Sequence, residues 1–561
     1  MKWKLSVGAV LVLGLVATLL VLLSGPRQVT LLLLNGRVYT VDGEMSVHEA
    51  IAIDGERVVE VGSSEEIGAS YLADTVIDLE GRPVYPGFID SHAHLESLGS
   101  VLVTLNLAQS GSLEEVRRLV REAAATKDPG QWIVGRGWDQ NRWPEKRFPH
   151  QRDLAGVAPE NPVYLVRIDG HAVWVNGPAL QRVGISMKTA DPPGGKILRD
   201  EDGQPTGVFI DRAIDLVSSV VPRPTPEERA ALLERAAAEC VRYGLTQVHD
   251  MGVDSTAVLI YERLATEGRL PLRVYAALEG LEHAWEWYRR RGPDIQRPGN
   301  MLTIRAVKLY ADGALGSRGA AMLEPYSDDP ANRGLTLTSQ ADLRRAADWC
   351  LEAGFQLCVH AIGDRGNALT LDVYEDALKS FDVKAKDARF RVEHAQVLHP
   401  EDIPRFARLG VIPSMQPSHC TSDMYWAEER VGPERVRGAY AWRSLLDAGS
   451  IIPAGSDFPV ESPDPLLGFY AAITRQDLDG WPEGGWYGEQ RMTRQEALKA
   501  FTTWGAYAAF QEGVKGSLEP GKWADLVVLS DDLMSIPAEE IPTVRVDLTI
   551  VAGRVVFSAE E

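Results

Sequence analysis

Two histidines separated by one residue give the strongest chemical signal in the sequence. His92 and His94 lie in residues 90–94, directly after an apolar stretch at residues 84–89. Side chains two apart on a strand point to the same side, so this spacing can present two imidazoles to one ion. The same spacing also occurs by chance, and the pair alone leaves metal binding and a structural role open.

Further residues that could bind metal lie at or near the ends of other apolar segments: His360 ends 356–360, His394 ends 390–394, Asp457 follows 452–454, and Lys308 lies within 305–310. Each has an ordinary alternative, because strand-end aspartates often form turns and lysines in apolar strands often extend to solvent. On the strands of one barrel, however, these side chains would lie at the same level and converge on one cavity.

The apolar segments alternate with helical patterns, as in a parallel barrel. We expect strands at residues 84–89, 246–249, 273–277, 304–309, 356–360, 390–394, 412–416 and 452–454. Helical patterns lie between most of them, for example at 227–243 and 340–353. Eight such units predict an α/β fold, a (β/α)8 TIM barrel at residues 85–509, with catalytic groups at the carboxyl ends of its strands.

Two further units are expected around the barrel. The gap between the first two predicted strands is too long for a loop and predicts an inserted α+β subdomain at residues 100–225, over the barrel mouth. Both chain ends show short strand patterns broken by Asn-Gly, Asp-Gly and Ala-Gly turns. We expect residues 27–84 and 510–561 to form one small composite β-sandwich domain.

The candidate ligands occur together with longer motifs. These are VKLYADGALGSR at 307–318, VHAIGD at 359–364, QPSH at 416–419 and GVKGSLEPGKWAD at 513–525. With His92-x-His94, Lys308, His360, His394 and Asp457, they resemble the amidohydrolase superfamily, and within it the amidohydrolase 3 family, whose members include N-substituted formamide deformylases. The resemblance extends from about residue 30 to the end of the chain.

The resemblance implies one or two divalent cations per chain. One cation would be bound by His92, His94 and Asp457, a second by His360 and His394, and both by a carboxylated Lys308. An unmodified Lys308 would favour a single-metal site, because an ammonium group repels a dication. Nitrogen-rich ligands favour zinc, with manganese, iron and cobalt left open.

Asp457 is the expected catalytic residue. A bound dication lowers the pKa of its water from about 15.7 towards 7, and Asp457 would carry the proton to the leaving nitrogen. Expected substrate contacts are Arg167, His171, Asp312, Arg318, His419 and Trp426. Local ion pairs are the alternative for the arginines and Asp312. Glu393 and Asp364 adjoin expected ligand positions, and we expect them to support the ligands through hydrogen bonds.

Charge and composition exclude other classes of protein. The chain has 561 residues and a net charge of −21, which disfavours binding to nucleic acid. Its four cysteines form no CxxC pair, so a thiolate zinc site is not expected. A homodimer is plausible by resemblance.

The first residues have a separate composition. Lys2 and Lys4 precede an uncharged apolar stretch at residues 5–24, which is long enough to span a bilayer. Residues 1–26 therefore predict a signal sequence or a membrane anchor, and the lack of a convincing cleavage site favours the anchor. The two lysines place the body of the protein in the periplasm or another extracytoplasmic space.

We expect a metal-dependent amidohydrolase that hydrolyses a non-peptide C–N bond of a small-molecule amide or N-substituted formamide. A hydrolase of the same scaffold that acts on lactones, cyclic imides or phosphoesters would use the same attack by water. A non-catalytic, membrane-anchored binding protein would be expected to have lost ligands, and all six expected ligand positions are present.

Overall fold

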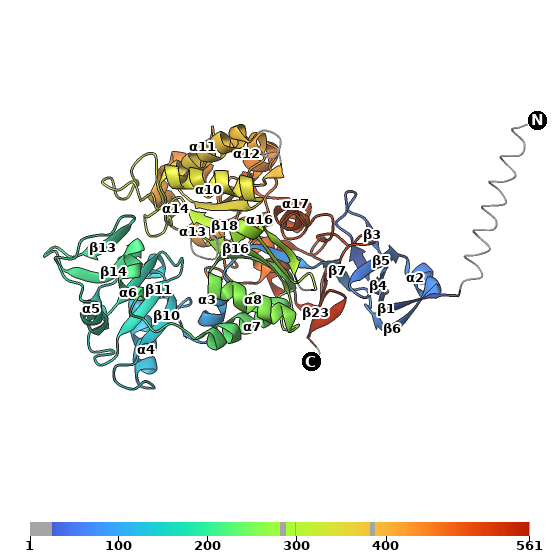
Figure 1. The fold of residues 1–561 in the computed structure, drawn as a ribbon, viewed down its shortest axis with the longest axis horizontal. Helices are drawn as coiled ribbons and strands as arrows, with labels where there is room; N and C mark the ends of the chain where they lie inside the picture. The colour runs from blue at the N-terminus through green and yellow to red at the C-terminus, as the bar shows by residue number, and fades with distance from the viewer. Residues whose placement is uncertain (1–24, 281–287, 298, 382–386, 560–561) are drawn as a thin grey trace, which may run out of the picture.

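The computed structural model describes residues 25–280, 288–297, 299–381 and 387–559. A barrel of parallel strands lies between an α+β unit on one side and a β-rich unit on the other (Figure 1). The parallel strands are, in spatial order, β8 (Phe88–Ala93), β15 (Leu245–Val253), β16 (Arg273–Glu279), β18 (Leu302–Tyr310), β19 (Gln356–Ala361), β20 (Arg391–His394) and β21 (Ile412–Ser414). A short strand, β17 (Asp294–Arg297), pairs antiparallel with β18.

Residues 453–457 close the barrel without forming a regular strand. The predicted strand at 452–454 is reduced to an isolated bridge between Ala454 and Met415. On one side the amide of Met415 donates to the carbonyl of Pro453 (3.2 Å), and on the other the amide of Ser91 donates to that of Ala454 (2.9 Å). The segment thus links β21 to β8 and takes the place of an eighth strand, which gives a TIM-like barrel as predicted.

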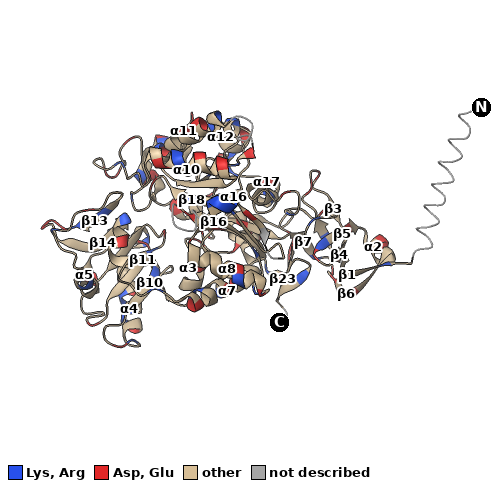
Figure 2. Ribbon diagram, viewed as in Figure 1, with Lys and Arg blue, Asp and Glu red and all other residues tan. Residues whose placement is uncertain are grey.

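Helices surround the barrel on its outside and at its mouth. They are α3 (Leu95–Val101), α7 (Pro226–Arg242), α8 (Ser255–Thr266), α10 (Gln340–Ala353), α11 (Asp364–Ser380), α12 (Ile403–Leu409), α13 (Pro417–Asp423), α14 (Ala427–Arg435), α15 (Trp442–Asp447), α16 (Pro465–Thr474), α17 (Arg494–Ala500) and α18 (Thr503–Ala508). Acidic and basic residues are interspersed along α10 and α11 (Figure 2), as in the pair Arg344–Asp348 at 2.8 Å.

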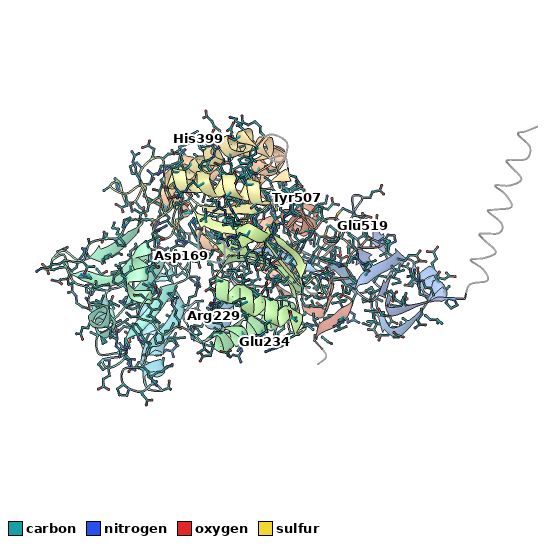
Figure 3. All side chains as sticks on the ribbon, in the orientation of Figure 1. Asp169, Arg229, Glu234, His399, Tyr507 and Glu519 are labelled. Atoms are coloured by element: carbon teal, nitrogen blue, oxygen red, sulfur yellow. The ribbon has the colours of Figure 1, made fainter. Side chains whose placement is uncertain are left out.

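Helix α7 shows how local sequence sets these elements. Thr225 and Glu228 form a capping box, and Pro226 occupies the first turn, so the helix begins where its free amides are satisfied. The half-buried Arg229 of α7 pairs with Glu96 of α3 (2.6 Å) and with Asp254 (3.0 Å) (Figure 3). These pairs join α7 to α3, which follows β8, and to Asp254, which follows β15.

The segment between β8 and β15 forms a mixed sheet of its own. Its strands, in spatial order, are β13 (Gly195–Arg199), β14 (Pro205–Asp211), β12 (Ala172–Val175), β11 (Val163–Arg167), β10 (Ile133–Trp138) and β9 (Leu105–Asn106). The accompanying helices are α4 (Leu113–Ala124), α5 (Gly177–Val183) and α6 (Asp215–Ser218). Trp138, Trp143 and Trp174 are buried in one core cluster of this unit.

Two sheets combine the two ends of the chain. One contains β5 (Arg57–Gly62), β4 (Ala50–Asp54), β1 (Arg27–Leu34) and β6 (Tyr71–Asp78), with α2 (Ser64–Ser70) beside it. The other contains β24 (Arg554–Ser558), β23 (Val546–Val551), β22 (Leu526–Leu529), β7 (Pro83–Pro86), β2 (Arg37–Tyr39) and β3 (Val47–His48). Leu33, Ile51 and Leu526 share one core, which joins the two termini. The domain boundaries themselves stay predictions.

No helix in the described ranges is long and apolar enough to cross a membrane. The apolar stretch at residues 5–24 lies outside those ranges. The predicted signal or anchor therefore stays a prediction, as do the extracytoplasmic location and the homodimer.

Candidate active site

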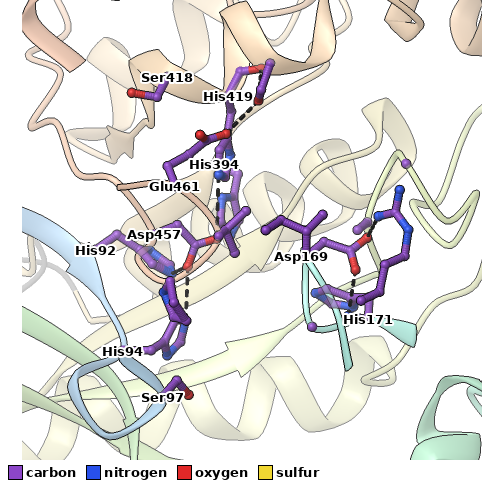
Figure 4. A pocket seen from close by; sticks show the side chains of 18 of the residues that line it. His92, His94, Ser97, Asp169, His171, His394, Ser418, His419, Asp457 and Glu461 are labelled. Atoms are coloured by element: carbon purple, nitrogen blue, oxygen red, sulfur yellow. Dashed lines mark hydrogen bonds and ion pairs between the residues drawn. The ribbon is translucent and has the colours of Figure 1, made fainter. Parts of the chain in front are cut away.

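A cavity of about 1550 Å³ lies between the carboxyl ends of the barrel strands and the inserted sheet. Most of the residues predicted to do chemistry line it: His92, His94, Arg167, His171, Lys308, His360, His394, His419, Trp426 and Asp457. Figure 4 shows several of these side chains pointing into the same space. Residues from distant parts of the chain thus meet here, because strands of one barrel end on the same side.

His92, His94 and Asp457 form the tightest cluster of possible metal ligands. His94 Nε2 lies 3.1 Å and His92 Nε2 lies 3.5 Å from Asp457 Oδ1. The three ligand atoms all lie within 4.8 Å of one another. The amide of Asp457 donates to the carbonyl of His92 (2.8 Å), which fixes the loop after residues 453–455 against the end of β8.

Lys308, His360 and His394 adjoin this cluster from β18, β19 and β20. Lys308 Nζ lies 3.1 Å from His92 Nε2. The ring of His394 is centred 4.8 Å from that of His92 and 4.5 Å from that of His360. All six predicted ligands therefore occupy one end of the barrel.

Hydrogen bonds orient two of the imidazoles. His92 Nδ1 lies 2.6 Å from Glu393 Oε2, and His394 Nδ1 lies 2.7 Å from Gln416 Oε1. With Nδ1 occupied in this way, Nε2 is left as the available ligand atom. Glu393 therefore supports a candidate ligand, as the sequence predicts, whereas Asp364 accepts backbone amides of Leu323 and Arg365.

The electrostatics of the cluster suit a divalent cation. Burial lowers the pKa of His92, His360 and His394 well below the usual range, which leaves their imidazoles neutral. Burial also lowers the pKa of Lys308. Burial alone would raise the pKa of Asp457, but the neighbouring imidazoles of His92 and His94, the latter at 3.1 Å, lower it below its usual value and keep the carboxylate ionised.

Buried polar atoms in the cluster also indicate a site for a metal ion. Within the described part of the chain, His419 Nε2 is buried without a hydrogen-bond partner, and the buried Asp457 Oδ1 faces only the imidazoles of His92 and His94. Buried polar atoms without partners are costly unless something absent from the chain itself pairs with them. Neutral imidazoles beside an ionised carboxylate are donors that fit zinc and similar divalent ions.

Predicted substrate contacts from the inserted sheet also reach the cavity. The ring of His171 is centred 5.1 Å from that of His360, and its Nδ1 lies 2.7 Å from Asp211 Oδ1. Burial would lower the pKa of His171, but the hydrogen bond to Asp211 raises it overall. Arg167 donates to Asp139 and Asp169, each at 2.5 Å. Asp169 lies where the inserted sheet faces the barrel (Figure 3).

His419 and Trp426 line the cavity from the segment after β21. The ligand atom of His419 lies within 4.8 Å of those of His394 and Asp457. His419, predicted as a substrate contact, thus also belongs to a second group of possible metal ligands, which the sequence did not indicate.

Two predicted substrate contacts, Asp312 and Arg318, do not line the cavity, and their contact with substrate stays a prediction. Asp312 is fully buried, and its oxygens accept the backbone amides of Ala321, Ile362 and Gly363 at 2.8 to 2.9 Å. Burial raises its pKa to about 7. Arg318 pairs with Asp328 at 2.9 Å. In the structure both side chains are engaged by the loop after β18 and its neighbours.

Sequence reasoning missed two residues at the site. Gln416 stands in a motif that the resemblance used, but its contact with His394 follows only from the fold. Arg136 lies in β10 between Gly135 and Gly137 and lines the cavity. An arginine between two glycines at the end of a strand-like run is the signal that could have pointed to it.

Comparisons with known proteins agree with this architecture. The chain is 32% identical over 533 residues to the putative amidohydrolase YtcJ of Bacillus subtilis, covering 93% of this chain and 98% of that protein. It is 29% identical over 539 residues to the N-substituted formamide deformylase of Arthrobacter pascens, covering 93% and 97%.

Solved structures give the same result. An uncharacterized metal-dependent hydrolase from Pyrococcus horikoshii superposes with a TM-score of 0.72 at 28% identity, covering 91% of this chain and 99% of that one. Atrazine chlorohydrolase TrzN from Arthrobacter aurescens, complexed with zinc, shares the fold with a TM-score of 0.52 at 17% identity, covering 95% and 96%. The profile of the amidohydrolase family matches residues 75–557, and the chain therefore belongs to the amidohydrolase family of hydrolases.

Proposed function

We propose that the protein is a metal-dependent amidohydrolase that hydrolyses a non-peptide C–N bond in an amide or N-substituted formamide. The observation that carries the proposal is the cluster of His92, His94 and Asp457, whose ligand atoms lie within 4.8 Å of one another at the mouth of the barrel. The similarity to the N-substituted formamide deformylase supports this class of bond.

We assign His92, His94 and Asp457 to one divalent cation, zinc in the first instance. His360 and His394 would hold a second, with Lys308 between them as a carboxylated lysine. The lowered pKa of Lys308 supports this step, because only the neutral amine takes up carbon dioxide. Cations bound at these residues supply Lewis acidity toward water and the substrate carbonyl.

The side chains of the protein would transfer the proton of the attacking water and orient the substrate. Asp457, ionised and 3.1 Å from His94 Nε2, would accept a proton from the attacking water and pass it to the departing nitrogen. An amine leaves poorly unless it is protonated, so this transfer would assist departure of the nitrogen. His171, bonded to Asp211 and beside the ring of His360, would orient the carbonyl group.

Asp457→Asn tests the assignment. This variant keeps the shape of the side chain but cannot carry the proton, so we expect turnover to fall by about 10²- to 10⁴-fold. Wild type and variant, reconstituted with zinc or manganese, are assayed on N-formyl amines, acyl amino acids, lactones and phosphotriesters. Asp477→Asn is the control, because Asp477 lines the outer cavity and bonds to Tyr425 instead of a candidate ligand.

Circular dichroism and metal analysis accompany the rates. A wild-type rate in Asp457→Asn would refute the proposed role of this carboxylate. Turnover of lactones or phosphotriesters alone would favour a different bond on the same scaffold. A protein that neither holds metal nor gains activity from it would favour a binding function.

A further inference from the structure

Arg136, a partly buried arginine in the lining of the cavity, lacks, among the residues that the structure describes, the carboxylate partner that buried arginines normally have. Arg167 is paired with two carboxylates, whereas Arg142 and Arg212 extend into solvent. Arg136 is partly buried, and within the described residues no carboxylate oxygen lies within 4.0 Å of it. Its Nη2 donates to the carbonyl of Ile168 (3.1 Å), while its buried Nε has no partner.

The guanidinium of Arg136 lies close to the candidate metal ligands. A methyl group on Gly170 would come within 3.3 Å of Arg136 Nη2, so the guanidinium rests on the turn that precedes His171. The ring of His171 is in turn centred 5.1 Å from that of His360. The negative charge of Asp457 acts on Arg136 and partly offsets the effect of burial, which lowers the pKa of this arginine. Arg136 therefore faces the same space as the reacting groups.

Nearby carboxylates are already engaged by other side chains. Asp139 and Asp169 both pair with Arg167, and Asp211 pairs with His171. A positive charge is thus left without a counterion in this part of the cavity. A partly buried, unpaired guanidinium is costly unless the substrate supplies an anion, and its fork of donors matches a carboxylate.

We propose that Arg136 binds a carboxylate of the substrate, so that the enzyme acts on N-acyl or N-formyl derivatives of amino-acid-like compounds. The proposal rests on the proposed amidohydrolase function. The acidic residues around Arg136 would repel a dianion such as a phosphate monoester more strongly than a carboxylate. The apolar part of the lining, which includes Leu98, Leu309 and Leu315, can take up an apolar side group.

Two substrates that differ only in the carboxylate test this: N-formylphenylalanine and N-formylphenethylamine. We expect wild type to favour the acid by at least tenfold in kcat/KM. Arg136→Gln should lose at least tenfold on the acid and change less than twofold on the neutral amide. The control Arg142→Gln, at an exposed arginine of the same cavity, should keep the wild-type ratio. Equal ratios in wild type and Arg136→Gln would overturn the proposal.

Binding separates this proposal from the proposed function. Calorimetry on the metal-loaded protein uses the sulfonamides N-methanesulfonylphenylalanine and N-methanesulfonylphenethylamine, which are not hydrolysed. If wild type binds the acid more tightly than the neutral sulfonamide, and Arg136→Gln does not, the proposal is supported. This holds even if neither formamide is hydrolysed, and in that case only the proposed function fails. Hydrolysis of the neutral formamide without preference for the acid would leave that function standing and refute the role of Arg136. If Arg136→Gln does not fold, Arg136→Lys, which keeps the charge and loses the fork, replaces it.

Discussion

Glu393 offers a sharp test of how the barrel interior prepares its ligands. Its Oε2 lies 2.6 Å from His92 Nδ1, and its Oε1 lies 2.7 Å from Arg391 Nε. All three side chains are 0% exposed. The perturbation is Glu393→Gln, which keeps an oxygen that can accept from His92 but removes the charge that balances Arg391.

Two magnitudes follow from this geometry. Changing a partner that orients a metal-bound histidine lowers metal affinity about 10- to 100-fold, which is about 1.4–2.8 kcal/mol. Removing one member of a buried ion pair costs about 3–5 kcal/mol of folding free energy. We expect values near the lower end for stability, because Arg391 keeps hydrogen bonds to Ser91 and Ser414.

The assays are zinc competition with a chromophoric chelator and urea unfolding of the metal-free protein. Glu512→Gln is the matched control: Glu512 also pairs with an arginine, Arg389, at 2.8 Å, but its side chain is 43% exposed. A pair this exposed contributes less than about 1 kcal/mol, and the control should leave zinc affinity unchanged. Wild-type zinc affinity in Glu393→Gln would refute the claim that this carboxylate supports His92 as a ligand.

Two predictions concern stability away from the site. Burial would raise the pKa of Asp525, but the charges of Arg273 and Lys515, 2.7 and 3.2 Å away, lower it below the unfolded value. This carboxylate therefore stabilises the fold above pH ~4, and its contribution is lost as the pH falls further. In urea unfolding at a series of pH values, the free energy of unfolding should fall less below pH ~4 in Asp525→Asn than in wild type. The same pH dependence in both proteins would contradict this reasoning. Thr225→Ala removes the cap of α7 and should cost about 1 kcal/mol in urea unfolding, whereas no loss would show that the cap is redundant.

The sequence predicted most barrel strands because buried parallel strands are continuous apolar runs. The predicted strand at 84–89 is one exception: it divides between β7 of the terminal sheet and β8 of the barrel. The predicted strand at 356–360 differs from β19 by one residue, and the predicted helix at 340–353 coincides with α10. The strand at 452–454 was overestimated. Its pairing on both sides depends on neighbours far away in the chain, Met415 and Ser91, which no local pattern contains.

The position of the candidate ligands could be predicted from the sequence, whereas the contacts of the surrounding loop residues could not. A barrel places every strand end on one side, so the ends of β8, β19 and β20 must meet whatever their loops do. Loop residues have no such constraint. Asp312 and Arg318 follow β18 closely, yet one turns to backbone amides and the other to Asp328.

The inserted sheet not only covers the site but also contributes side chains to it. The neutral state of His360 depends on burial, and the ring packed beside it is that of His171, which precedes β12 in the insertion. The same sheet carries Arg136 at the mouth of the cavity. In this view the barrel supplies the metal ligands, and the insertion supplies both the burial of these ligands and the charge that selects the substrate. A change at Arg136 should then alter substrate selectivity and leave metal affinity unchanged. A change at Glu393 should alter metal affinity and leave substrate selectivity unchanged. Measuring zinc affinity and substrate ratio in both variants therefore separates the two contributions.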